Sequence, residues 1–441
     1  MTDTVKKNAL LIIKRLREAG FNAILVGGVV RDIIMGIKPE DYDIATDASP
    51  SDVERLFDRV VPIGKQFGVS IIILDGKSYE VARFRMDGIY EDGRRPSWIE
   101  PSTMKEDVKR RDFTINALMY DPFDDRVIDY VGGREDIRDR IIRTVGNPDQ
   151  RFSEDLLRML RGVRFAAQFD FTIERNTLDA LRRHAPEILS VSSERIGEEL
   201  MKMFTCDTPN RALTLLDETG LLDVVLPEVA VMKGVRQPPE FHPEGDVFEH
   251  TRNMLEISGG GTVSLAFGIL LHDVGKPVTF TETDRIRFNR HAEAGAVIAA
   301  DILGRLRFSR EIIDRVCALV KNHMRFADAQ NMRRSTLKRF IDMEGFEEML
   351  ELYRLECLVK HSSLEIYEFV KNTMEHEKDK PCKPLINGDD LIELGYEPGH
   401  LFGKIIRNVM DAQLDGVISN REEAIEFVLR DFPPGGKKLN R

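Results

Sequence analysis

The stretch VGGVVRD at residues 26–32, followed by the tripeptide DYD at residues 41–43, decides the fold expected of this chain. The apolar run at residues 23–26 predicts a strand that ends at the two glycines, and residues 29–35 predict a short helix after them. Glycines at such a turn let backbone N–H groups approach a phosphate, and the N-terminus of a helix favours its negative charge. The stretch therefore predicts a phosphate-binding turn.

Two carboxylates follow this turn. If Asp41 and Asp43 lie on a strand, their spacing puts both side chains on one face. Oxygen ligands of this kind hold Mg²⁺, which supports phosphoryl or nucleotidyl transfer. A glycine pair or a DxD alone is more often a surface turn, but the two in this order favour the catalytic interpretation. Glu80, on the second strand of a predicted hairpin, either completes the metal cluster or is a charge at the edge of the sheet.

The chain has 441 residues, 42% of them hydrophobic, which is enough for about three globular domains. Apolar runs are too short to span a membrane, and the N-terminus lacks the pattern of a signal peptide. The four cysteines lie far apart and form no CxxC pair, which favours a reducing, cytoplasmic compartment and argues against a cysteine zinc site.

The net charge of −11 argues against a nucleic acid partner. Global charge is a weak guide, however, because binding needs only a local positive region of the surface. Residues 134–211 are rich in arginine and contain a single lysine, Lys202. Arginine suits contacts to phosphates and bases. Acidic residues are about as numerous in this segment, so ion pairing on helix faces is a serious alternative.

Strand-like segments are confined to the first part of the chain. Two β-rich runs flank residues 75–77, which predicts a hairpin, so residues 1–140 are expected to form a mixed α/β domain with a short sheet. A long polar segment, residues 87–107, contains the only tryptophan, Trp98, and such loops are usually mobile or functional. From residue 134 onward the periodicity is helical, and the expected fold class is α+β.

The segment RRDFTINA at residues 110–117 interleaves charged and apolar side chains. Two adjacent guanidinium groups, Arg110 and Arg111, can clamp a triphosphate, and Asp112 can accept a hydrogen bond from a ribose hydroxyl. The apolar side chains would fill the core from the opposite face. A strand or helix edge with charges placed by chance is the less attractive alternative.

The segment EDLLR at residues 154–158 opens a predicted helix in which Asp155 and Arg158 share a face. An acceptor beside a donor matches the pairing edges of cytosine and adenine, whereas uracil and guanine would leave unmatched groups. Unmatched buried groups cost roughly 1–3 kcal/mol each, enough for discrimination. A plain intrahelical ion pair, worth about 0.3–0.5 kcal/mol, explains the same two residues. The residues alone do not decide between the two interpretations.

In their order and spacing, GGVVRD, DYD, RRDFTINA and EDLLRMLRGVRFA resemble the signature segments of bacterial class II tRNA nucleotidyltransferases, the CCA-adding enzymes and their poly(A) polymerase relatives. The resemblance covers roughly the first half of the chain. It implies a polymerase-β-like nucleotidyltransferase head with a small mixed sheet, followed by helical parts. The implied ranges are 1–140 for the head, 141–233 for a neck and body that select the base and bind RNA, 234–335 for an HD-type domain and 336–441 for a helical tail.

The resemblance also implies the roles of individual residues. Asp41 and Asp43 would hold Mg²⁺ and carry catalysis, with Glu80 as a further ligand. Nucleotide binding would fall to Gly27, Gly28, Arg31, Arg111, Asp112, Asn116, Glu154, Asp155, Arg158 and Arg161. Among these, Glu154, Asp155 and Arg158 resemble the protein template that selects CTP and ATP, and residues 192–195 resemble a neck segment that supports it.

Family members that add only CC lack a flexible loop at the position of the long polar segment. This chain keeps one, which favours addition of the terminal A, alone or after CC. Its candidate residues are Asp87, Tyr90, Asp92, Arg94, Arg95 and Pro96.

Histidines gather between residues 242 and 323, around His272-Asp273 in the segment LLHDVGKP. Imidazoles beside a carboxylate suit a divalent transition metal. The HD pair followed by GK resembles HD-type metal phosphohydrolases, and a degenerate HD fold that only supports the body is the alternative. The resemblance implies metal ligands at His250, His272, Asp273 and His323, with Asp328 as a late carboxylate.

The expected function is template-independent addition of CCA, from CTP and ATP, to the 3′ end of tRNA. The alternatives are addition of A alone or poly(A) synthesis, and a phosphohydrolase whose head binds RNA without catalysis. No membrane attachment is expected, and the sequence leaves the oligomeric state open.

Overall fold

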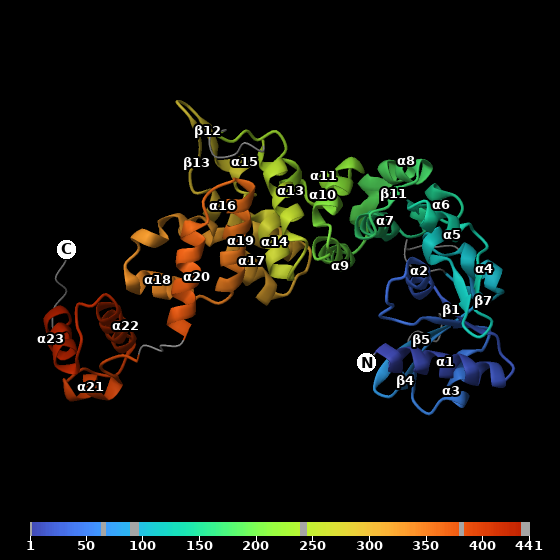
Figure 1. Cartoon of the computed structure of the whole chain (residues 1–441), viewed down its shortest axis with the longest axis horizontal. Coiled ribbons are helices and arrows are strands. Elements are labelled where there is room, and N and C mark those ends of the chain that lie inside the picture. The colour runs from blue at the N-terminus through green and yellow to red at the C-terminus, as the bar shows by residue number, and fades with distance from the viewer. Residues whose placement is uncertain (1, 63–67, 89–96, 239–244, 379–382, 434–441) are drawn as a thin grey trace. The chain divides into compact units, whose positions relative to one another are not determined.

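The computed structural model describes residues 2–62, 68–88, 97–238, 245–378 and 383–433. Contacts divide the chain into two units: residues 1–233, 255–266 and 301–308 form the first, and residues 234–254, 267–300 and 309–441 form the second. Figure 1 shows the strands of the main sheet close to the N-terminus and helices through the remainder of the chain. This arrangement confirms the predicted α+β class, with a sheet-containing head followed by helices.

The main sheet lies in the first unit and has seven strands in the order β3-β4-β5-β2-β1-β8-β9. All neighbouring strands are antiparallel except β2 and β5, which run parallel, so the sheet is mixed as predicted. Its strands are β1 (Ala23–Val26), β2 (Ile44–Thr46), β3 (Val60–Pro62), β4 (Val69–Leu74), β5 (Lys77–Arg83), β8 (Met119–Asp121) and β9 (Arg126–Ile128).

Local sequence explains how these elements begin and end. Asp75 and Gly76 adopt φ values of 50° and 70°, which close the predicted hairpin between β4 and β5 through a two-residue turn. Helix α3 (Pro50–Leu56) begins with a capping box between Ser49 and Asp52, in which each side chain accepts a backbone N–H of the other residue.

The predicted long loop is flanked by a second hairpin. Strands β6 (Arg85–Asp87) and β7 (Ile99–Pro101) pair antiparallel, and Trp98 directly precedes β7. Of the loop residues singled out in the sequence, Asp87 lies in β6, whereas Tyr90, Asp92, Arg94, Arg95 and Pro96 lie outside the described residues.

Helix α7 approaches the RRDFTINA segment closely. A Cβ atom at Gly162 would lie 2.9 Å from the ring of Phe113, so only glycine permits this packing. Phe113, Ile115 and Ala117 are fully buried, as predicted for the apolar half of that segment. The helices of the first part of the chain are α1 (Thr2–Glu18), α2 (Gly28–Met35), α4 (Met104–Lys109), α5 (Gly133–Arg138), α6 (Pro148–Glu154), α7 (Leu157–Gln168), α8 (Arg175–His184), α9 (Ser193–Phe204), α10 (Pro209–Glu218), α11 (Leu221–Val225) and α12 (Pro227–Ala230).

Helices also dominate the chain after residue 234. The segment from residue 247 to 378 contains one short hairpin, β12 (Phe280–Glu282) with β13 (Ile286–Phe288). Its helices are α13 (Val247–Ser258), α14 (Val263–Leu271), α15 (Lys276–Thr279), α16 (His291–Arg305), α17 (Arg310–Asn322), α18 (Arg334–Ile341), α19 (Phe346–Val359) and α20 (Glu365–Lys378). None of the described helices combines the length and the apolar character needed to cross a membrane.

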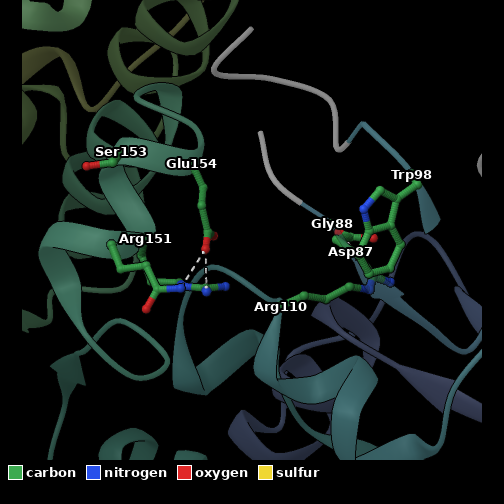
Figure 2. Close-up of a pocket in the computed structure, with 8 residues that line it drawn as sticks. Asp87, Gly88, Trp98, Arg110, Arg151, Ser153 and Glu154 are labelled. Atoms are coloured by element: carbon green, nitrogen blue, oxygen red, sulfur yellow. Dashed lines mark hydrogen bonds and ion pairs between the residues drawn. The ribbon is translucent and has the colours of Figure 1, made fainter. Parts of the chain in front are cut away.

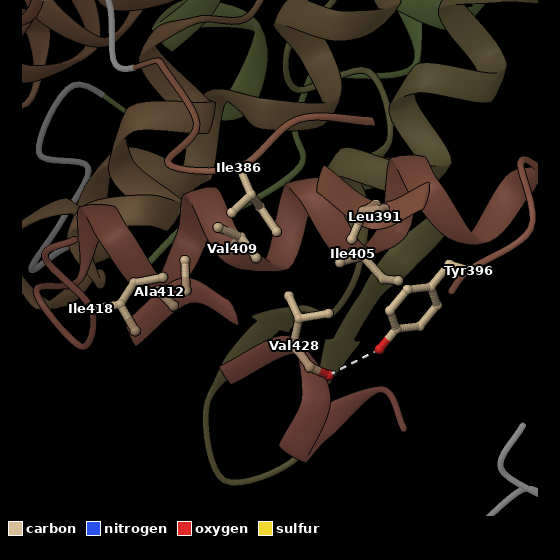
Figure 3. Packing of buried hydrophobic residues seen from close by; sticks show 9 residues of the cluster. Ile386, Leu391, Tyr396, Ile405, Val409, Ala412, Ile418 and Val428 are labelled. Carbon is tan, nitrogen blue, oxygen red and sulfur yellow. Dashed lines mark hydrogen bonds between the residues drawn. The ribbon is translucent and has the colours of Figure 1, made fainter. Parts of the chain in front are cut away.

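The last three helices, α21 (Gly388–Glu393), α22 (His400–Leu414) and α23 (Arg421–Asp431), share a small core. Figure 3 shows Leu391 and Tyr396 facing this core, in which the Tyr396 hydroxyl donates to the backbone carbonyl of Val428 at 3.5 Å. The tail therefore has apolar packing of its own, consistent with the helical tail expected at the end of the chain.

Candidate active site and metal cluster

The glycine turn lies between a carboxylate and a guanidinium. Gly27 has a φ of 78°, a conformation that favours glycine, and a Cβ atom there would lie 3.3 Å from Nη1 of Arg111 and 3.9 Å from Oδ2 of Asp43. Helix α2 begins at the next residue, so its first backbone N–H groups face this position. The structure thus brings together three of the predicted site residues, Gly27, Asp43 and Arg111, around a turn that is too tightly surrounded to favour a side chain.

The two aspartates directly precede β2 rather than lying inside it, so the prediction of a strand through both residues is wrong in its boundary. The backbone is nevertheless extended, because the carbonyl of Asp43 accepts a hydrogen bond from the Val26 N–H at 3.1 Å. Asp41 and Asp43 are exposed whereas Tyr42 between them is buried, so both carboxylates share one face.

Glu80 lies beside Asp43 across the sheet, because β2 and β5 run parallel with Ile44 opposite Val81. Partial removal from water and the charges of Glu80 and Asp41 raise the pKa of the Asp43 carboxyl to about 6, although Arg111 opposes the shift. This mutual repulsion favours Glu80 as a member of the carboxylate cluster over an isolated edge charge. Carboxylate oxygens are the ligands that a hard divalent cation prefers, and a bound cation would relieve the repulsion, although among the described residues the ligand atoms of these three side chains do not all lie within 4.8 Å of one another.

The raised pKa of Asp43 predicts a stability effect. A carboxyl that titrates near pH 6 in the folded chain and near 3.8 otherwise favours folding when protonated and opposes it when ionised. In metal-free buffer at pH 8, Asp43→Asn is therefore expected to raise Tm, by about 2–4 °C for a partly exposed group worth about 1 kcal/mol. The gain should vanish below about pH 4. Thermal unfolding at pH 8 and pH 4 measures it, with the exposed Asp58→Asn as control, and a lower Tm for Asp43→Asn at pH 8 would contradict the assignment.

The predicted nucleotide-binding residues of the head and of helix α7 form one hydrogen-bonded chain. Arg31 donates from Nη1 to Oδ1 of Asn116 at 2.7 Å, and Asn116 donates from Nδ2 to Oδ1 of Asp112 at 3.4 Å. Arg161 of α7 donates from Nε and Nη2 to Oδ2 of Asp112, at 2.9 and 2.7 Å. Burial would raise the pKa of Asp112, but the Arg161 guanidinium outweighs it and holds that pKa below the ordinary value. Asp112 is therefore an ionised acceptor, held in place by an arginine of the helical part.

Two phenylalanines that the sequence did not single out support this chain of contacts. The guanidinium of Arg31 lies 4.4 Å from the ring centre of Phe169 and 5.4 Å from that of Phe165. Arg164 lies 4.3 Å from the Phe165 ring and donates to Glu199 at 2.7 Å. Phe165 lies in α7 and Phe169 follows it as the C-cap, four residues later, a spacing that could have indicated contact between the two side chains. Through these cation–π contacts, the two rings link Arg31, a predicted phosphate-binding residue, to helix α7.

The EDLLR segment is broken, not helical throughout as predicted. Helix α6 ends at Glu154, and Asp155 has an extended backbone before α7 begins at Leu157. The Asp155 carboxylate accepts the Leu157 N–H at 3.1 Å and pairs with Arg195 at 2.9 Å. The backbone break explains why the shared helical face expected for Asp155 and Arg158 is not formed.

Arg158, which follows the helix break at Asp155, has partners of its own. It pairs with Glu154 at 2.8 Å and donates from Nη2 to the backbone carbonyl of Arg110 at 3.2 Å. The acceptor Asp155 and the donor Arg158 thus have separate partners, in Arg195 and Glu154. The sequence alone could not identify Arg195 as the partner of Asp155, although the segment at residues 192–195 was expected to support the template.

A pocket of about 510 Å³ opens beside these segments. Figure 2 shows Trp98 and Gly88 on one of its sides and Arg151 and Glu154 on another, with Arg110 between them. Its lining residues are Asp87, Gly88, Trp98, Arg110, Gln150, Arg151, Ser153 and Glu154. The pocket therefore adjoins both RRDFTINA and EDLLR.

A buried cluster of histidines and one aspartate occupies the second unit. Two overlapping groups, each with ligand atoms within 4.8 Å of one another, share Asp273 and are the only such groups among the described residues. They are His250 with His272 and Asp273, and Asp273 with His291 and His323. The structure therefore brings together all four predicted ligands and adds His291. Asp328, the predicted late carboxylate, is exposed and lies outside both groups, so that expectation is wrong.

Backbone contacts orient the imidazoles of this cluster. The Nδ1 atoms of His272, His291 and His323 lie 2.8, 2.9 and 2.7 Å from the carbonyl oxygen three residues earlier. With Nδ1 donating to that carbonyl, Nε2 is the atom left to bind a metal. Burial lowers the pKa of His323 to about 4, so this ring is uncharged at neutral pH, as a metal ligand must be.

Lys276 and Glu356 add charge beside the cluster, and neither was among the residues predicted from the sequence. The buried Lys276 ammonium forms an ion pair with Oδ2 of Asp273 at 2.7 Å and donates a hydrogen bond to Oε1 of Gln237 at 2.6 Å. Burial opposes ionisation of Glu356, but the ammonium of Lys360 outweighs it, so the pKa of Glu356 lies below the ordinary value. The GK pair after HD was the only sequence signal for Lys276.

Family models match three parts of the chain. The model of the poly(A) polymerase head domain covers residues 23–143, that of the probable RNA- and SrmB-binding site of polymerase A covers residues 170–233, and that of the HD domain covers residues 247–361. These ranges contain the glycine turn with its carboxylates, the helices after EDLLR, and the histidine cluster.

Individual proteins of similar sequence or structure also match this chain. A CCA-adding enzyme of Bacillus licheniformis is 46% identical over 214 residues, which is 48% of this chain and 54% of that enzyme, so this match spans about half of its length. The solved structure of the Bacillus stearothermophilus CCA-adding enzyme in complex with CTP has 26% identity and a TM-score of 0.69 over 96% of this chain and 97% of that one. A CCA-adding enzyme of Bacillus velezensis is 32% identical over 95% of this chain and 96% of its own length. Because this last match spans nearly all of both proteins, the chain belongs to the CCA-adding enzyme family of tRNA nucleotidyltransferases.

Proposed function

We propose that this chain adds C, C and A in turn to the 3′ end of tRNA, taking the nucleotides from CTP and ATP without a nucleic acid template. The observation that carries the proposal is the convergence of the Gly27 turn, Asp43 and Arg111 in a chain related over its whole length to CCA-adding enzymes. A tRNA substrate also makes a cytoplasmic location the natural one for the enzyme.

Asp41 and Asp43, just before the central strand β2, would hold Mg²⁺ together with Glu80 of the neighbouring strand β5. When bound, Mg²⁺ helps to ionise the terminal ribose hydroxyl and stabilises the pyrophosphate that leaves. The backbone N–H groups at the start of α2, from Gly28 onward, would face the triphosphate, whereas the Gly27 N–H donates to the Leu118 carbonyl at 3.1 Å. These residues bring the reacting groups together and hold them in line.

The remaining predicted residues would orient the nucleotide. Arg31 and Arg111 place positive charge on either side of the glycine turn, where they would bind phosphates. Asp112 would accept a hydrogen bond from the ribose, and Asn116 and Arg161 hold its carboxylate. Asp155 and Arg158 would read the pairing edge of the base, with Arg195 and Glu154 fixing their positions.

Incorporation assays with each nucleotide supplied separately distinguish this proposal from addition of A alone. A tRNA that ends at the discriminator base should gain two residues with CTP alone and a third when ATP is added. UTP and GTP should be poor substrates, and ATP alone should not yield a long poly(A) tail. An enzyme that fails to extend this tRNA with CTP but extends a tRNA ending in CC with ATP adds only the final A.

A second activity, in the histidine cluster, is favoured by the buried groups that share Asp273. Nitrogen donors beside one carboxylate fit a divalent transition metal such as Mn²⁺, Fe²⁺, Co²⁺ or Ni²⁺, and a phosphodiester or phosphomonoester is the substrate class such a metal serves. We propose this HD-type range, residues 234–335, as a unit of function separate from the head at 1–140, the neck and body at 141–233, and the tail at 336–441.

Removal of the cluster tests the second activity independently of the first. His272→Ala with Asp273→Ala should lose bound transition metal, measured by elemental analysis of dialysed protein, and with it the chelator-sensitive hydrolysis of bis-p-nitrophenyl phosphate. The exposed His376→Ala is the control. Equal metal content in the cluster variant would refute the site. Hydrolysis without any nucleotide incorporation by the unaltered protein would instead favour a head that binds RNA without catalysis.

A further inference from the structure

The pocket beside the EDLLR segment contains an aromatic surface with no role in the mechanism above. Trp98 is 46% exposed, although it is the only tryptophan of the chain. A Cβ atom at Gly88 would lie 2.5 to 2.7 Å from three atoms of the indole, so the ring lies flat on the glycine backbone. The Gly88 N–H also donates to the Trp98 carbonyl at 2.9 Å. One face of the ring is thus supported by the hairpin, and the residue keeps nearly half of its surface open.

Charged groups form the rest of the pocket. Arg151 pairs with Glu154 at 2.6 Å, and Arg110 pairs with Asp107 at 2.7 Å, so the guanidinium groups are held in place. The volume of about 510 Å³ lies within the range of small-ligand pockets, about 300–1,000 Å³. A flat aromatic face beside polar groups suits a nucleobase, whose ring stacks while its edge and its sugar-phosphate remain polar.

The position of the pocket identifies which base it would hold. Arg110 adjoins Arg111, and Glu154 adjoins Asp155, so the pocket borders the residues proposed to bind the incoming nucleotide. The last nucleotide of the acceptor must lie next to that site, because its 3′ hydroxyl has to come within about 3–3.5 Å of the α-phosphorus.

We propose that Trp98, supported by Gly88, stacks on the last base of the tRNA acceptor during addition. This inference rests on the proposed function. The acceptor ends in a different base after the first addition, and stacking on an aromatic ring tolerates any base because every base has a π-face. A stacking platform therefore suits this position better than hydrogen-bonded base recognition, which the template residues supply for the incoming nucleotide.

The single tryptophan gives a direct test in the unaltered protein. In buffer with EDTA, so that no addition occurs, a tRNA ending in CC should quench the intrinsic tryptophan fluorescence, whereas CTP or ATP alone should not. Quenching by nucleotide alone would assign the ring to the incoming base and overturn the proposal. Unchanged fluorescence at saturating tRNA, with binding verified by filter retention, would overturn it as well.

Kinetics of variants give the second test. Trp98→Ala should raise KM for tRNA on the order of tenfold, with KM for ATP and CTP unchanged, and Trp98→Phe should restore most of the loss because a smaller ring still stacks. Tyr130→Ala, an equally exposed aromatic residue at 46%, is the matched control and should behave as the unaltered protein. A raised KM for nucleotide, or no change in either KM, would contradict the role of Trp98. Absence of incorporation by the unaltered protein would instead count against the proposed function.

Discussion

Replacement of Asp41 and Asp43 together by alanine is expected to reduce incorporation of CMP and AMP into tRNA by on the order of 10³-fold or more. The two carboxylates share a face just before the central strand β2, beside the glycine turn and Arg111. No other pair of side chains in the proposed mechanism holds the divalent cation. The measurement is single-turnover incorporation of labelled CTP into a tRNA that lacks its CCA end.

Two controls make this result specific. Asp58→Ala removes an exposed carboxylate of the same head and should leave the rate unchanged. Glu80→Gln should produce a smaller loss than the double variant, because Asp41 and Asp43 both remain to hold the cation. Incorporation at the normal rate by the double variant would refute the assignment of the catalytic centre, whatever the result at Glu80.

Substitution of Asp155 or Arg158 by alanine is expected to relax base selection while transfer continues. The preference for CTP and ATP over UTP and GTP should fall on the order of 10- to 100-fold, since each unmatched buried group costs roughly 1–3 kcal/mol. Relative kcat/KM values for the four nucleotides measure the effect. A uniform loss for all four, with preference intact, would show that these residues support the fold and do not read the base.

Arg195→Ala provides the intermediate case. Asp155 keeps its own carboxylate in this variant but loses the partner at 2.9 Å that holds it. Selectivity should therefore fall less than in Asp155→Ala, and KM should change more than kcat. The matched control is Arg175→Ala, which removes an arginine that is 92% exposed on the neighbouring helix α8.

The parts of the site that depend on local sequence were predictable. The glycine turn, the shared face of Asp41 and Asp43 and the capped and paired elements of the head follow from residues close together in the chain. The break at Asp155 was not predictable, because Arg195, which lies 40 residues away, helps to hold the carboxylate outside the helix. Periodicity alone continues a helix through such a position, since Leu156 and Leu157 fit the apolar pattern on both sides.

The ligands of the histidine cluster could likewise be predicted only in part from the sequence. The HD pair and the spacing of histidines pointed to a metal site, but nothing in the sequence ranks His291 above Asp328 as a ligand. The fold makes that choice by burying His291 against His323 at 3.2 Å and leaving Asp328 in solvent. Likewise, the contact of Arg31 with Phe169 joins segments far apart in the chain, so only the folded structure reveals it.

Anomalous diffraction from crystals that contain Mn²⁺ and CTP would locate both the catalytic cation and the incoming base. Manganese peaks are expected at the carboxylates of Asp41 and Asp43, with the triphosphate along the Gly27 turn and the edge of cytosine against Asp155 and Arg158. Aspartates without metal, or a cytosine bound away from the EDLLR segment, would contradict the proposed mechanism.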